Sequence, residues 1–391
     1  MKAEDIERAR LIAGRVEQFV RREVVPYERD QRWEGHGPTA ELVAELQRKA
    51  RAAELLAPHI AADGTHLSHR DMAPVLRAAG LSPLGPVALN VAAPDEGNMY
   101  LLGKIGTSRQ QEQFLRPLID ARMRSAFFMT EPASEGGAGS DPSMLQTTAT
   151  RDGDEWVING TKAFITGADG AGAGIIMAKT GDSATLFLVS LPNAAVRIER
   201  VYDTIDGSMP GGHALIQIEG LRVSAEQILG KIDEGFNYAQ IRLSPARLTH
   251  CMRWLGAASR CQEIATDYAV RRSAFGKLLV DHEGVGFMLA DNAIDLKQSE
   301  LIIDWCAEVL DSGAPGTTES SMTKVAVSEA LFRVADRCVQ IMGGTGVTRD
   351  TIVQQVFREL RAFRIYDGPT EVHRWSLAKK IKKDALGARL Q

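Results

Sequence analysis

The spacing of apolar residues changes twice along this chain of 391 residues. Over residues 3–121 apolar residues recur at helical spacing, with turns marked by glycine and proline as in Gly35-His-Gly-Pro38. Over residues 125–230 they alternate at a period of two, as in Ala214-Leu-Ile-Gln-Ile-Glu219. Beyond Gly235 the three- and four-residue steps of helices return. One strand-rich block therefore separates two helical blocks.

We predict an α+β chain that is mostly α-helical and has three domains. These are an N-terminal helical domain (1–121), a middle antiparallel β domain (122–232) and a C-terminal helical bundle (233–391). In the middle domain, Arg151-Asp-Gly-Asp154 and Asn159-Gly160 are typical of hairpin turns. In the bundle we expect a near-heptad stripe to face the core rather than a recognition surface, formed by Leu289, Ala293, Leu296, Ile303 and Leu310.

Composition excludes several classes of function. A formal charge of -4, with 44% apolar and 25% charged residues, is that of an ordinary globular protein. No basic patch is visible, so we expect no nucleic-acid partner. The four cysteines form no C-x-x-C pair and no histidines lie near them at metal-ligand spacing, so we expect no metal and reduced, buried thiols.

The N-terminal segment and the hydropathy argue against export. Met1-Lys-Ala-Glu-Asp-Ile-Glu-Arg8 is too charged for a signal peptide, and its acidic residues do not suit a transit peptide. No apolar run approaches the roughly 20 residues that a membrane helix needs. We therefore predict a cytoplasmic protein without membrane insertion.

The most informative segment for chemistry is Arg364-Ile-Tyr-Asp-Gly-Pro-Thr-Glu-Val-His-Arg374. Asp367 stands before a Gly-Pro break, where a helix ends and a side chain can face a cavity. A carboxylate in such a place is a candidate base. The alternative is structural, because an Asp before Gly-Pro also caps helices and closes turns.

Five further motifs accompany this segment: Thr130-Glu-Pro132, Gly137-Ala-Gly-Ser-Asp141, Asn159-Gly160 with Phe164-Ile-Thr166, Arg271-Arg-Ser-Ala-Phe-Gly-Lys277 and Gln340-Ile-Met-Gly-Gly-Thr-Gly346. In this order they resemble the acyl-CoA dehydrogenase family, flavoproteins that introduce a double bond between the α and β carbons of a CoA thioester. Within the family, this chain most resembles the branch that includes family members 10 and 11. The motifs that carry this resemblance are Asn98-Met99, Gly211-Gly-His213, Arg242-Leu-Ser-Pro-Ala-Arg247 and Asp367-Gly-Pro-Thr-Glu-Val-His373.

The resemblance implies FAD as the cofactor. It assigns the Met129 backbone and Thr130 to the isoalloxazine ring, and Ser140 to the flavin or the bound thioester. It also places Phe164 against the flavin and the Thr166 hydroxyl at its polar edge. The alternatives are a plain surface loop around Thr130 and simple core packing for Phe164.

The resemblance also implies an assembly of several subunits. Arg272 would pair with the FAD diphosphate, which suits the fork geometry of a guanidinium, and Phe275 would lie near the adenine. Gln340 and Gly344 belong to a glycine-rich break that receives the FAD of a neighbouring subunit in the family. We therefore expect a homo-oligomer, either a dimer or a tetramer.

The base itself departs from the family pattern. Most relatives read Tyr-Glu-Gly-Thr where this chain reads Tyr366-Asp-Gly-Pro369, and Asp is one methylene shorter than Glu. The resemblance implies that Pro369 replaces a threonine that contacts FAD, that Gly368 is where the backbone would pass the bound substrate, and that Glu371 would lie near the flavin nucleotide. If Asp367 is only a cap, Glu371 or Glu131 is the competing candidate for the base.

Substrate binding and the reaction follow from the same resemblance. Arg247 aligns with an arginine near the thioester and the CoA arm. Asp367 would take the α-proton of an acyl-CoA, the β-hydrogen would leave as hydride to FAD, and electrons would pass to an electron-transferring flavoprotein, as in β-oxidation of fatty acids. Two alternatives stay open, namely a flavin oxidase like the nitroalkane oxidase relatives and a catalytically inactive CoA-binding protein.

Overall fold

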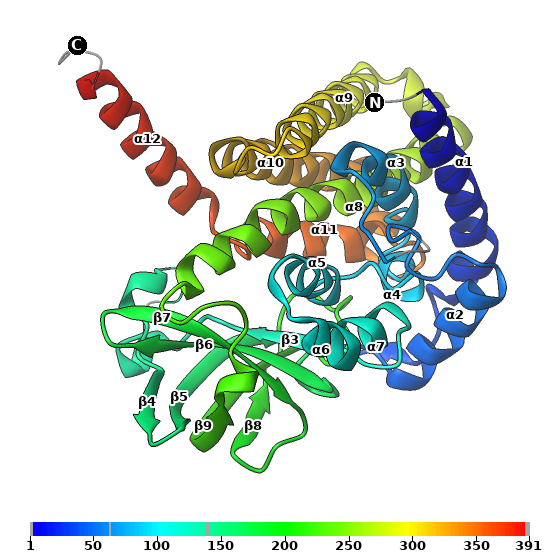
Figure 1. Ribbon diagram of the computed structural model, residues 1–391. Coiled ribbons are helices and arrows are strands. Elements are labelled where there is room, and N and C mark those ends of the chain that lie inside the picture. Colours follow the sequence, from blue (N-terminus) through cyan, green and yellow to red (C-terminus); the bar gives the residue numbers. More distant parts are fainter. Residues whose placement is uncertain (1–2, 62–63, 138, 140, 388–391) are drawn as a thin grey trace. The chain divides into compact units, whose positions relative to one another are not determined.

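The structure is a computed structural model that describes residues 3–61, 64–137, 139 and 141–387. It divides into two compact units. The helical unit comprises Met1–Asp30, Leu67–Pro86 and Arg247–Gln391, and the sheet unit comprises Gln31–His66 and Val87–Ala246. Helix α8 (Gly235–Arg271) contributes residues to both units. The two units are described separately below (Figure 1).

The sheet unit is built on a seven-stranded sheet with the order β3-β6-β4-β5-β9-β8, and β7 pairs with β6. The strands are β3 (Ser125–Phe128), β4 (Thr148–Asp152), β5 (Glu155–Thr166), β6 (Ala173–Thr180), β7 (Ser183–Ser190), β8 (Val196–Val201) and β9 (His213–Ser224). The predicted antiparallel pairing holds for β4–β5, β5–β9, β6–β7 and β8–β9, but β3 and β4 pair with β6 in parallel. Alternation of apolar residues reports which side chains are buried and carries no information on strand direction.

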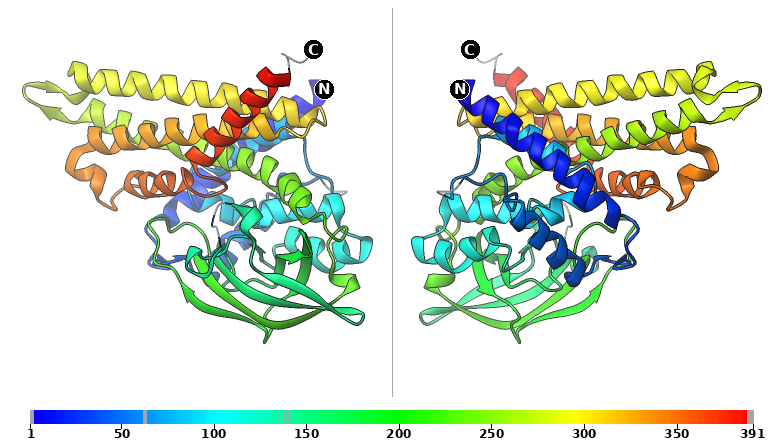
Figure 2. Two further views of the ribbon diagram at one scale, coloured as in Figure 1. Left: turned by 90° about the vertical axis from the view of Figure 1, so that its left-hand side faces the viewer. Right: turned by 90° about the vertical axis from the view of Figure 1, so that its right-hand side faces the viewer.

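The two faces of the sheet carry different cores. Along β6, Ile175 and Met177 belong to one buried cluster, whereas Ile176 and Ala178 belong to the other. This is the period of two expected for a strand buried on both faces. Helical segments cover the first face and contribute Met99 and Leu118 to its cluster (Figure 2). The helices of this unit are α2 (Ala40–Ala52), α5 (Asp95–Ile105), α6 (Ser108–Gln110) and α7 (Arg116–Ile119), and a small ribbon pairs β1 (Trp33–Glu34) with β2 (Gly37–Pro38). The short helix α4 (Gly85–Ala88) is divided between the two units.

Only one of the two predicted hairpin turns is present. Asp152 pairs with Glu155, which confirms the turn between β4 and β5. The prediction at Asn159-Gly160 is wrong, because β5 runs through it with a register shift between Ile158 and Gly160. Gly160 has a φ of +152°, and a Cβ there would lie 2.5 Å from the Thr147 hydroxyl. The glycine therefore serves a β-bulge, where backbone approaches closely.

The helical unit is a bundle of long helices joined by short connections (Figure 2). Its helices are α1 (Ala3–Phe19), α3 (His69–Ala79), α8 from Arg247 onward, α9 (Glu283–Asp311), α10 (Thr317–Met342), α11 (Val353–Phe363) and α12 (Thr370–Gly387). A ribbon of β10 (Ser273–Ala274) and β11 (Lys277–Leu278) joins α8 to α9. The four cysteines are buried and free, as predicted.

Helix α9 does not bury the predicted stripe. Of those five apolar residues only Ile303 is buried, and the first half of the buried seam is polar, with Asn292, Asp295 and Ser299. Asp295 of this seam binds Arg333 and Arg337 of α10, and these arginines hold the pKa of its carboxyl below the usual range. Long arginines across a helix pair satisfy buried acidic groups, which an apolar period cannot signal. The large exposed apolar side chains of α9 are Phe287, Ile294, Leu301 and Trp305.

No helix in the described part of the chain is both long enough and apolar enough to cross a membrane. Within the described ranges, no three His, Cys, Asp or Glu side chains are grouped so as to hold a metal ion.

Backbone contact between α3 and α8 generates a stability prediction. A Cβ at Gly256 would lie 2.0 Å from the Arg77 carbonyl oxygen, so Gly256→Ala forces the helices apart and should destabilise the fold by about 1–3 kcal/mol. Gly14→Ala in α1 is the matched control, because a Cβ there meets nothing within 4 Å. The control should be neutral or stabilising by up to about 1 kcal/mol. Thermal unfolding measures both, and equal midpoints would contradict the close contact.

Candidate functional site

The Asp367-Gly368 turn lies between α11 and α12 in the helical unit. Asp367 has a φ of +53° and Gly368 a φ of +101°. The left-handed region is uncommon for residues other than glycine, although aspartate enters it more readily than most, and contacts from three helices hold the turn in this conformation. A Cβ at Gly368 would lie 2.6 Å from Nε2 of His373, so a side chain is also excluded there by space. The backbone conformation and the close approach of His373 together require glycine at position 368.

Three cationic or imidazole side chains bind the carbonyl groups of this turn. Arg247 Nε donates to the Asp367 carbonyl oxygen at 2.9 Å, and His373 Nε2 lies 3.2 Å from the same oxygen. Lys324 Nζ donates to the Gly368 carbonyl oxygen at 2.7 Å. These donors come from α8, α12 and α10, so three helices fix the backbone that carries the carboxylate.

Burial changes the acid-base properties of these donors. It lowers the pKa of Lys324 to about 8, against the opposing effect of Asp367, and it also lowers the pKa of Arg247. Burial first, and then Arg247 and Lys324, lower the pKa of His373 to about 4. His373 is thus a neutral imidazole at pH 7, and its Nδ1 faces the Ser321 hydroxyl at 3.1 Å.

The Asp367 carboxylate faces a fourth group on α8. His250 Nε2 lies 3.4 Å from Asp367 Oδ2, and the Asp367 side chain keeps 22% of its surface exposed. The His250 ring packs beside Tyr366, with ring centroids 5.0 Å apart. A fixed, partly accessible carboxylate among cations and imidazoles can accept a proton from a bound carbon acid.

The two competing carboxylates have other environments. Glu371 is exposed at the start of α12. Glu131 is buried in the sheet unit, where it accepts hydrogen bonds from Lys162 and from the backbone of Gln146 and Thr147. Lys162 heads the interactions that hold the Glu131 pKa below its usual range despite burial. Glu131 therefore anchors the Thr-Glu-Pro segment.

The predicted flavin residues of the sheet unit lie together. Thr130 and Ala163 exchange two hydrogen bonds, one from the Thr130 hydroxyl at 2.5 Å and one between backbone groups at 2.9 Å. This pairing places Thr130 next to Phe164, and Lys162 Nζ donates to the Met129 carbonyl oxygen at 3.2 Å. Phe164 has a φ of +56° and is 60% exposed, and its ring stacks on Tyr202 at 4.4 Å. An exposed aromatic ring that an unusual backbone conformation presents suits a planar ligand.

Thr166 ends β5 in a chain of hydrogen bonds. Its hydroxyl lies 2.9 Å from His213 Nδ1, and His213 Nε2 lies 2.9 Å from Asp206 Oδ2. His213 holds the pKa of Asp206 below its usual range, against the effect of burial. Because the ionised Asp206 accepts from Nε2, the contact at Nδ1 fixes the Thr166 hydroxyl.

The remaining predicted cofactor residues lie at one end of the helical unit. Arg272 and Phe275 follow the end of α8, and Gln340 and Gly344 lie at the end of α10. Helices α8 and α10 both run toward the end where α9 begins, so the topology brings these segments to the same end of the bundle. All four are exposed, Phe275 by 97%. Ser140 lies outside the described residues, and Pro369 is half-buried beside the turn.

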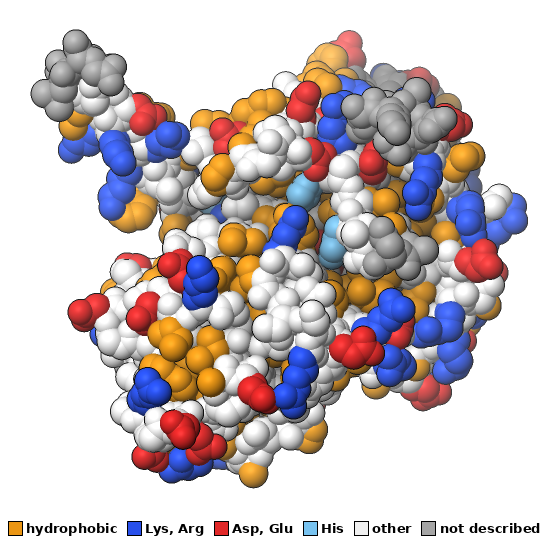
Figure 3. All heavy atoms as spheres, in the orientation of Figure 1, with side chains coloured by type: hydrophobic (Ala, Val, Ile, Leu, Met, Phe, Trp, Pro, Cys, Tyr) orange, Lys and Arg blue, Asp and Glu red, His pale blue; other side chains and the backbone are white. Residues whose placement is uncertain are grey.

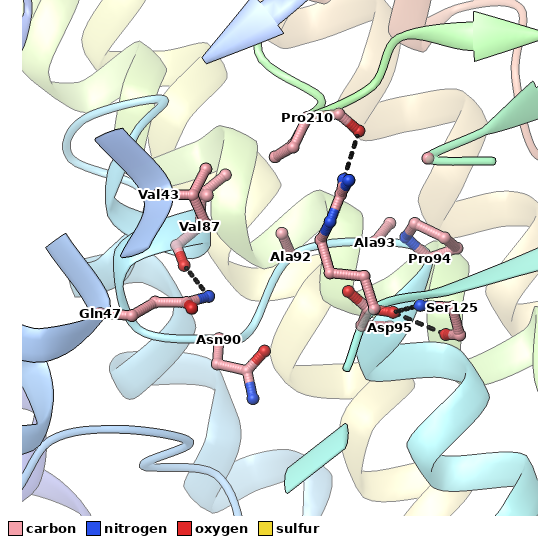
Figure 4. Close-up of a pocket in the computed structure, with 12 residues that line it drawn as sticks. Val43, Gln47, Val87, Asn90, Ala92, Ala93, Pro94, Asp95, Ser125 and Pro210 are labelled. Carbon is pink, nitrogen blue, oxygen red and sulfur yellow. Dashed lines mark hydrogen bonds between the residues drawn. The ribbon is translucent and has the colours of Figure 1, made fainter. Parts of the chain in front are cut away.

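A small cavity lies in the sheet unit beside the start of α5 (Figure 4). Asp95 accepts hydrogen bonds from the backbone N–H and the hydroxyl of Ser125, and burial raises the pKa of Asp95 to about 6. The free volume of about 20 Å³ suits a single water, so the cavity is too small for a flavin or an acyl chain. Close by, Asn98 and Arg242, from two branch motifs, form a buried hydrogen bond of 2.7 Å.

Charged side chains of both signs are interspersed over the face drawn in Figure 3. Sequence reasoning missed most of the buried polar network, including His250, Lys324, His373 and His213. The available signal was a polar residue inside an apolar helical run, as for His250 between Leu248 and Met252.

Comparisons with known proteins identify one family along the chain. Three family models match in chain order: the N-terminal domain of acyl-CoA dehydrogenases over residues 7–122, the middle domain over 126–211 and the C-terminal domain over 233–382. The probable acyl-CoA dehydrogenase FadE2 of Mycobacterium tuberculosis is 36% identical, over 86% of this chain and 85% of its own length. The chain belongs to the acyl-CoA dehydrogenase family. The predicted order of a helical, a β and a helical domain is thereby confirmed.

Other relatives extend the similarity. Acyl-CoA dehydrogenase family member 11 of Gallus gallus is 33% identical over 94% of this chain, and the chain spans about half (50%) of that protein's length. A solved structure from Mycobacterium abscessus has a TM-score of 0.87 at 32% identity, covering 97% of this chain and 98% of the other. Butyryl-CoA dehydrogenase from Megasphaera elsdenii has a TM-score of 0.83 at 25% identity, covering 97% and 99%.

The neutral imidazole of His373 generates a prediction about pH. Its folded pKa of about 4 lies below the usual imidazole value of 6.5, so the unfolded chain binds a proton that the folded chain excludes. The contribution of His373 to the free energy of unfolding is complete above pH 6.5 and is lost as the pH falls toward 4. His373→Gln keeps a donor but does not titrate, so its unfolding midpoint should fall less over this range than that of the wild type. Parallel pH dependences of the two midpoints would contradict the assignment.

Proposed function

We propose that this chain is an FAD-dependent acyl-CoA dehydrogenase that converts an acyl-CoA thioester to its 2-enoyl-CoA. The observation that carries the proposal is the Asp367 carboxylate, which a left-handed turn presents and three helices hold. Membership of the family supports the same reaction class. The pathway of fatty acid oxidation, a cytoplasmic location and an electron-transferring flavoprotein as acceptor complete the proposal.

Asp367 acts as the base in this proposal. Its carboxylate takes the α-proton, and the β-hydrogen leaves with its electron pair, so the α and β carbons gain a double bond. The α C–H is acidic enough only when the thioester carbonyl is polarised by hydrogen-bond donors. We assign one of these donors to the backbone N–H of Asp367. Arg247 and Gly368 lie at the same turn and are the proposed contacts for the thioester and the CoA arm.

FAD, when bound, supplies the two-electron acceptor for the departing hydride. In the sheet unit, Met129, Thr130, Phe164 and Thr166 would hold its ring system, and Ser140 remains a candidate from the motif. In the helical unit, Arg272 and Phe275 would hold the diphosphate and adenine. Gln340 and Gly344 would serve the FAD of another subunit, and Pro369 and Glu371 remain candidates near the nucleotide. The exposed Phe164 ring, which an unusual backbone conformation presents, is the feature that best fits a flavin.

We also propose a homo-oligomer, a dimer or a tetramer. Helix α9 exposes Phe287, Ile294, Leu301 and Trp305 at spacings of seven and four residues, which places them along one face. Exposed apolar stripes of this kind mark protein interfaces. A shared FAD site would make the assembly necessary for cofactor binding.

The flavin assignment can be tested at Arg272. Arg272→Ala should lower flavin occupancy, because losing a charge-assisted contact to the diphosphate costs about 1.5–3 kcal/mol, or roughly a 10- to 100-fold weaker affinity. Arg271→Ala is the matched control, since Arg271 binds Asp267 in the last turn of α8. Absorbance of flavin per chain after purification and dilution measures both. Full occupancy in the Arg272 variant would remove its proposed role.

The base assignment can be tested at Asp367. Asp367→Asn should keep its yellow flavin yet bleach about 100- to 10,000-fold more slowly with acyl-CoA, because an amide cannot accept the α-proton. Glu371→Gln is the comparison, because Glu371 is both the competing candidate for the base and a candidate contact of the nucleotide. Any loss in this variant should appear as weaker flavin binding, and its flavin-loaded form should bleach at least tenfold faster than Asp367→Asn. Asp367→Glu should overpack the site or change the preferred acyl chain. A bleaching rate for Asp367→Asn within tenfold of wild type would overturn the assignment.

A further inference from the structure

Three side chains on one face of α8 contact the segment that carries the proposed base. Arg247, His250 and Trp254 are spaced by three and four residues, so their side chains leave the helix on the same side. Arg247 binds the Asp367 carbonyl oxygen, and Trp254 Nε1 donates to the Tyr366 hydroxyl at 2.6 Å. Between them His250 faces the Asp367 carboxylate. Arg247 thus contacts the backbone of this segment, Trp254 contacts the side chain of Tyr366, and His250 faces the carboxylate.

We propose that His250 is a positioning residue that fixes the Asp367 carboxylate by a hydrogen bond from Nε2–H to Oδ2, leaving Oδ1 to take the α-proton. This inference rests on the proposed function, in which Asp367 is the base. It assigns a role in the reaction to a buried side chain for which the sequence motifs predicted none.

The geometry restricts what His250 can do. An ionised carboxylate only accepts hydrogen bonds, so a ring nitrogen that faces it must carry the proton. The 3.4 Å separation is long for a hydrogen bond, and such contacts shorten when substrate binds. His250 is 4% exposed, and its ring packs against Tyr366 and Phe363 with centroids 5.0 and 5.9 Å away. The imidazole is therefore oriented by packing before any substrate arrives.

A short base has particular need of such a partner. Aspartate reaches one methylene less far than the family's usual glutamate, and an error of about 1 Å in a reacting group can cost roughly 100-fold in rate. The contacts of Arg247, Lys324 and His373 described above are to backbone carbonyl oxygens, and they do not themselves fix the rotation of the carboxylate group. A donor at Oδ2 restrains that rotation.

The pH dependence of proton abstraction should report the same contact. The charged and titratable groups that face the carboxylate from the surrounding elements are Arg247 and His250 on α8, Lys324 on α10 and His373 on α12. A donor to the ionised form favours ionisation of Asp367. Removal of the His250 donor should therefore move the acid limb of the bleaching rate to higher pH, by about one pH unit.

The test compares two substitutions of nearly equal shape. His250→Gln places an amide N–H near the position of Nε2, and His250→Met fills similar space without a donor. A panel of saturated thioesters from butanoyl-CoA to palmitoyl-CoA is first tested on the wild type, and the one that bleaches its flavin fastest is chosen. Both variants are then assayed anaerobically with this thioester as folded, flavin-loaded protein. We expect the Gln variant to bleach within about threefold of wild type. We expect the Met variant to be about 10- to 100-fold slower, with its acid limb shifted and its KM little changed.

The ratio of the Gln rate to the Met rate decides the proposal, because general damage to packing slows both variants alike. Equal rates with unshifted acid limbs would overturn the positioning role. Asp367→Asn, measured alongside, separates the two levels of the account. If that variant still bleaches, the proposed base is wrong. If it does not bleach while the two His250 variants match each other, the proposed function stands and only the role of His250 fails.

Discussion

The arrangement around the proposed base depends on one strained turn. Asp367 and Gly368 both adopt positive φ values, which the chain tolerates because Arg247, His373 and Lys324 bind the carbonyl oxygens of the turn. Those donors are buried on three helices, so their own desolvation must be offset by the contacts that they make. The depressed pKa values of Lys324 and His373 record that cost. The turn and the polar core of the bundle are thus mutually dependent.

The same principle recurs in the sheet unit. Buried Lys162 and Glu131 pair at 2.9 Å and fix the segment that carries Met129 and Thr130. Burial lowers the pKa of Lys162 to about 8, even though Glu131 opposes that effect. In both units a buried cation holds a backbone segment beside residues assigned to ligand binding. Rigid second contacts of this kind are what precise placement of reacting groups requires.

The sequence was sufficient for the architecture and less so for its details. The change of period between Ala121 and Ser125 located the helical and strand-rich blocks, because burial of one face leaves a direct trace in residue spacing. Sheet direction, the bulge at Gly160 and the polar seam around Asp295 left no such trace. Each depends on a partner far away in the chain, such as Arg333 and Arg337 for Asp295.

The candidate site was predictable to a similar degree. The motif around Asp367 indicated a carboxylate at a break between helices, and the structure has it in a turn between α11 and α12. The side chains that surround it come from α8, α10 and α12, and a single isolated histidine or lysine in a helix carries no sign of its partner. The contacts of His250 and Lys324 with this turn therefore could not be predicted from the sequence and are seen only in the structure.

Anaerobic mixing with a series of saturated acyl-CoA thioesters tests the central claim most directly. Flavin absorbance and the thioester product are followed together in the purified, flavin-loaded protein. The account predicts that at least one thioester bleaches the flavin and yields one 2-enoyl-CoA for each flavin reduced. A yellow protein that no thioester bleaches, or bleaching without enoyl-CoA, would contradict it.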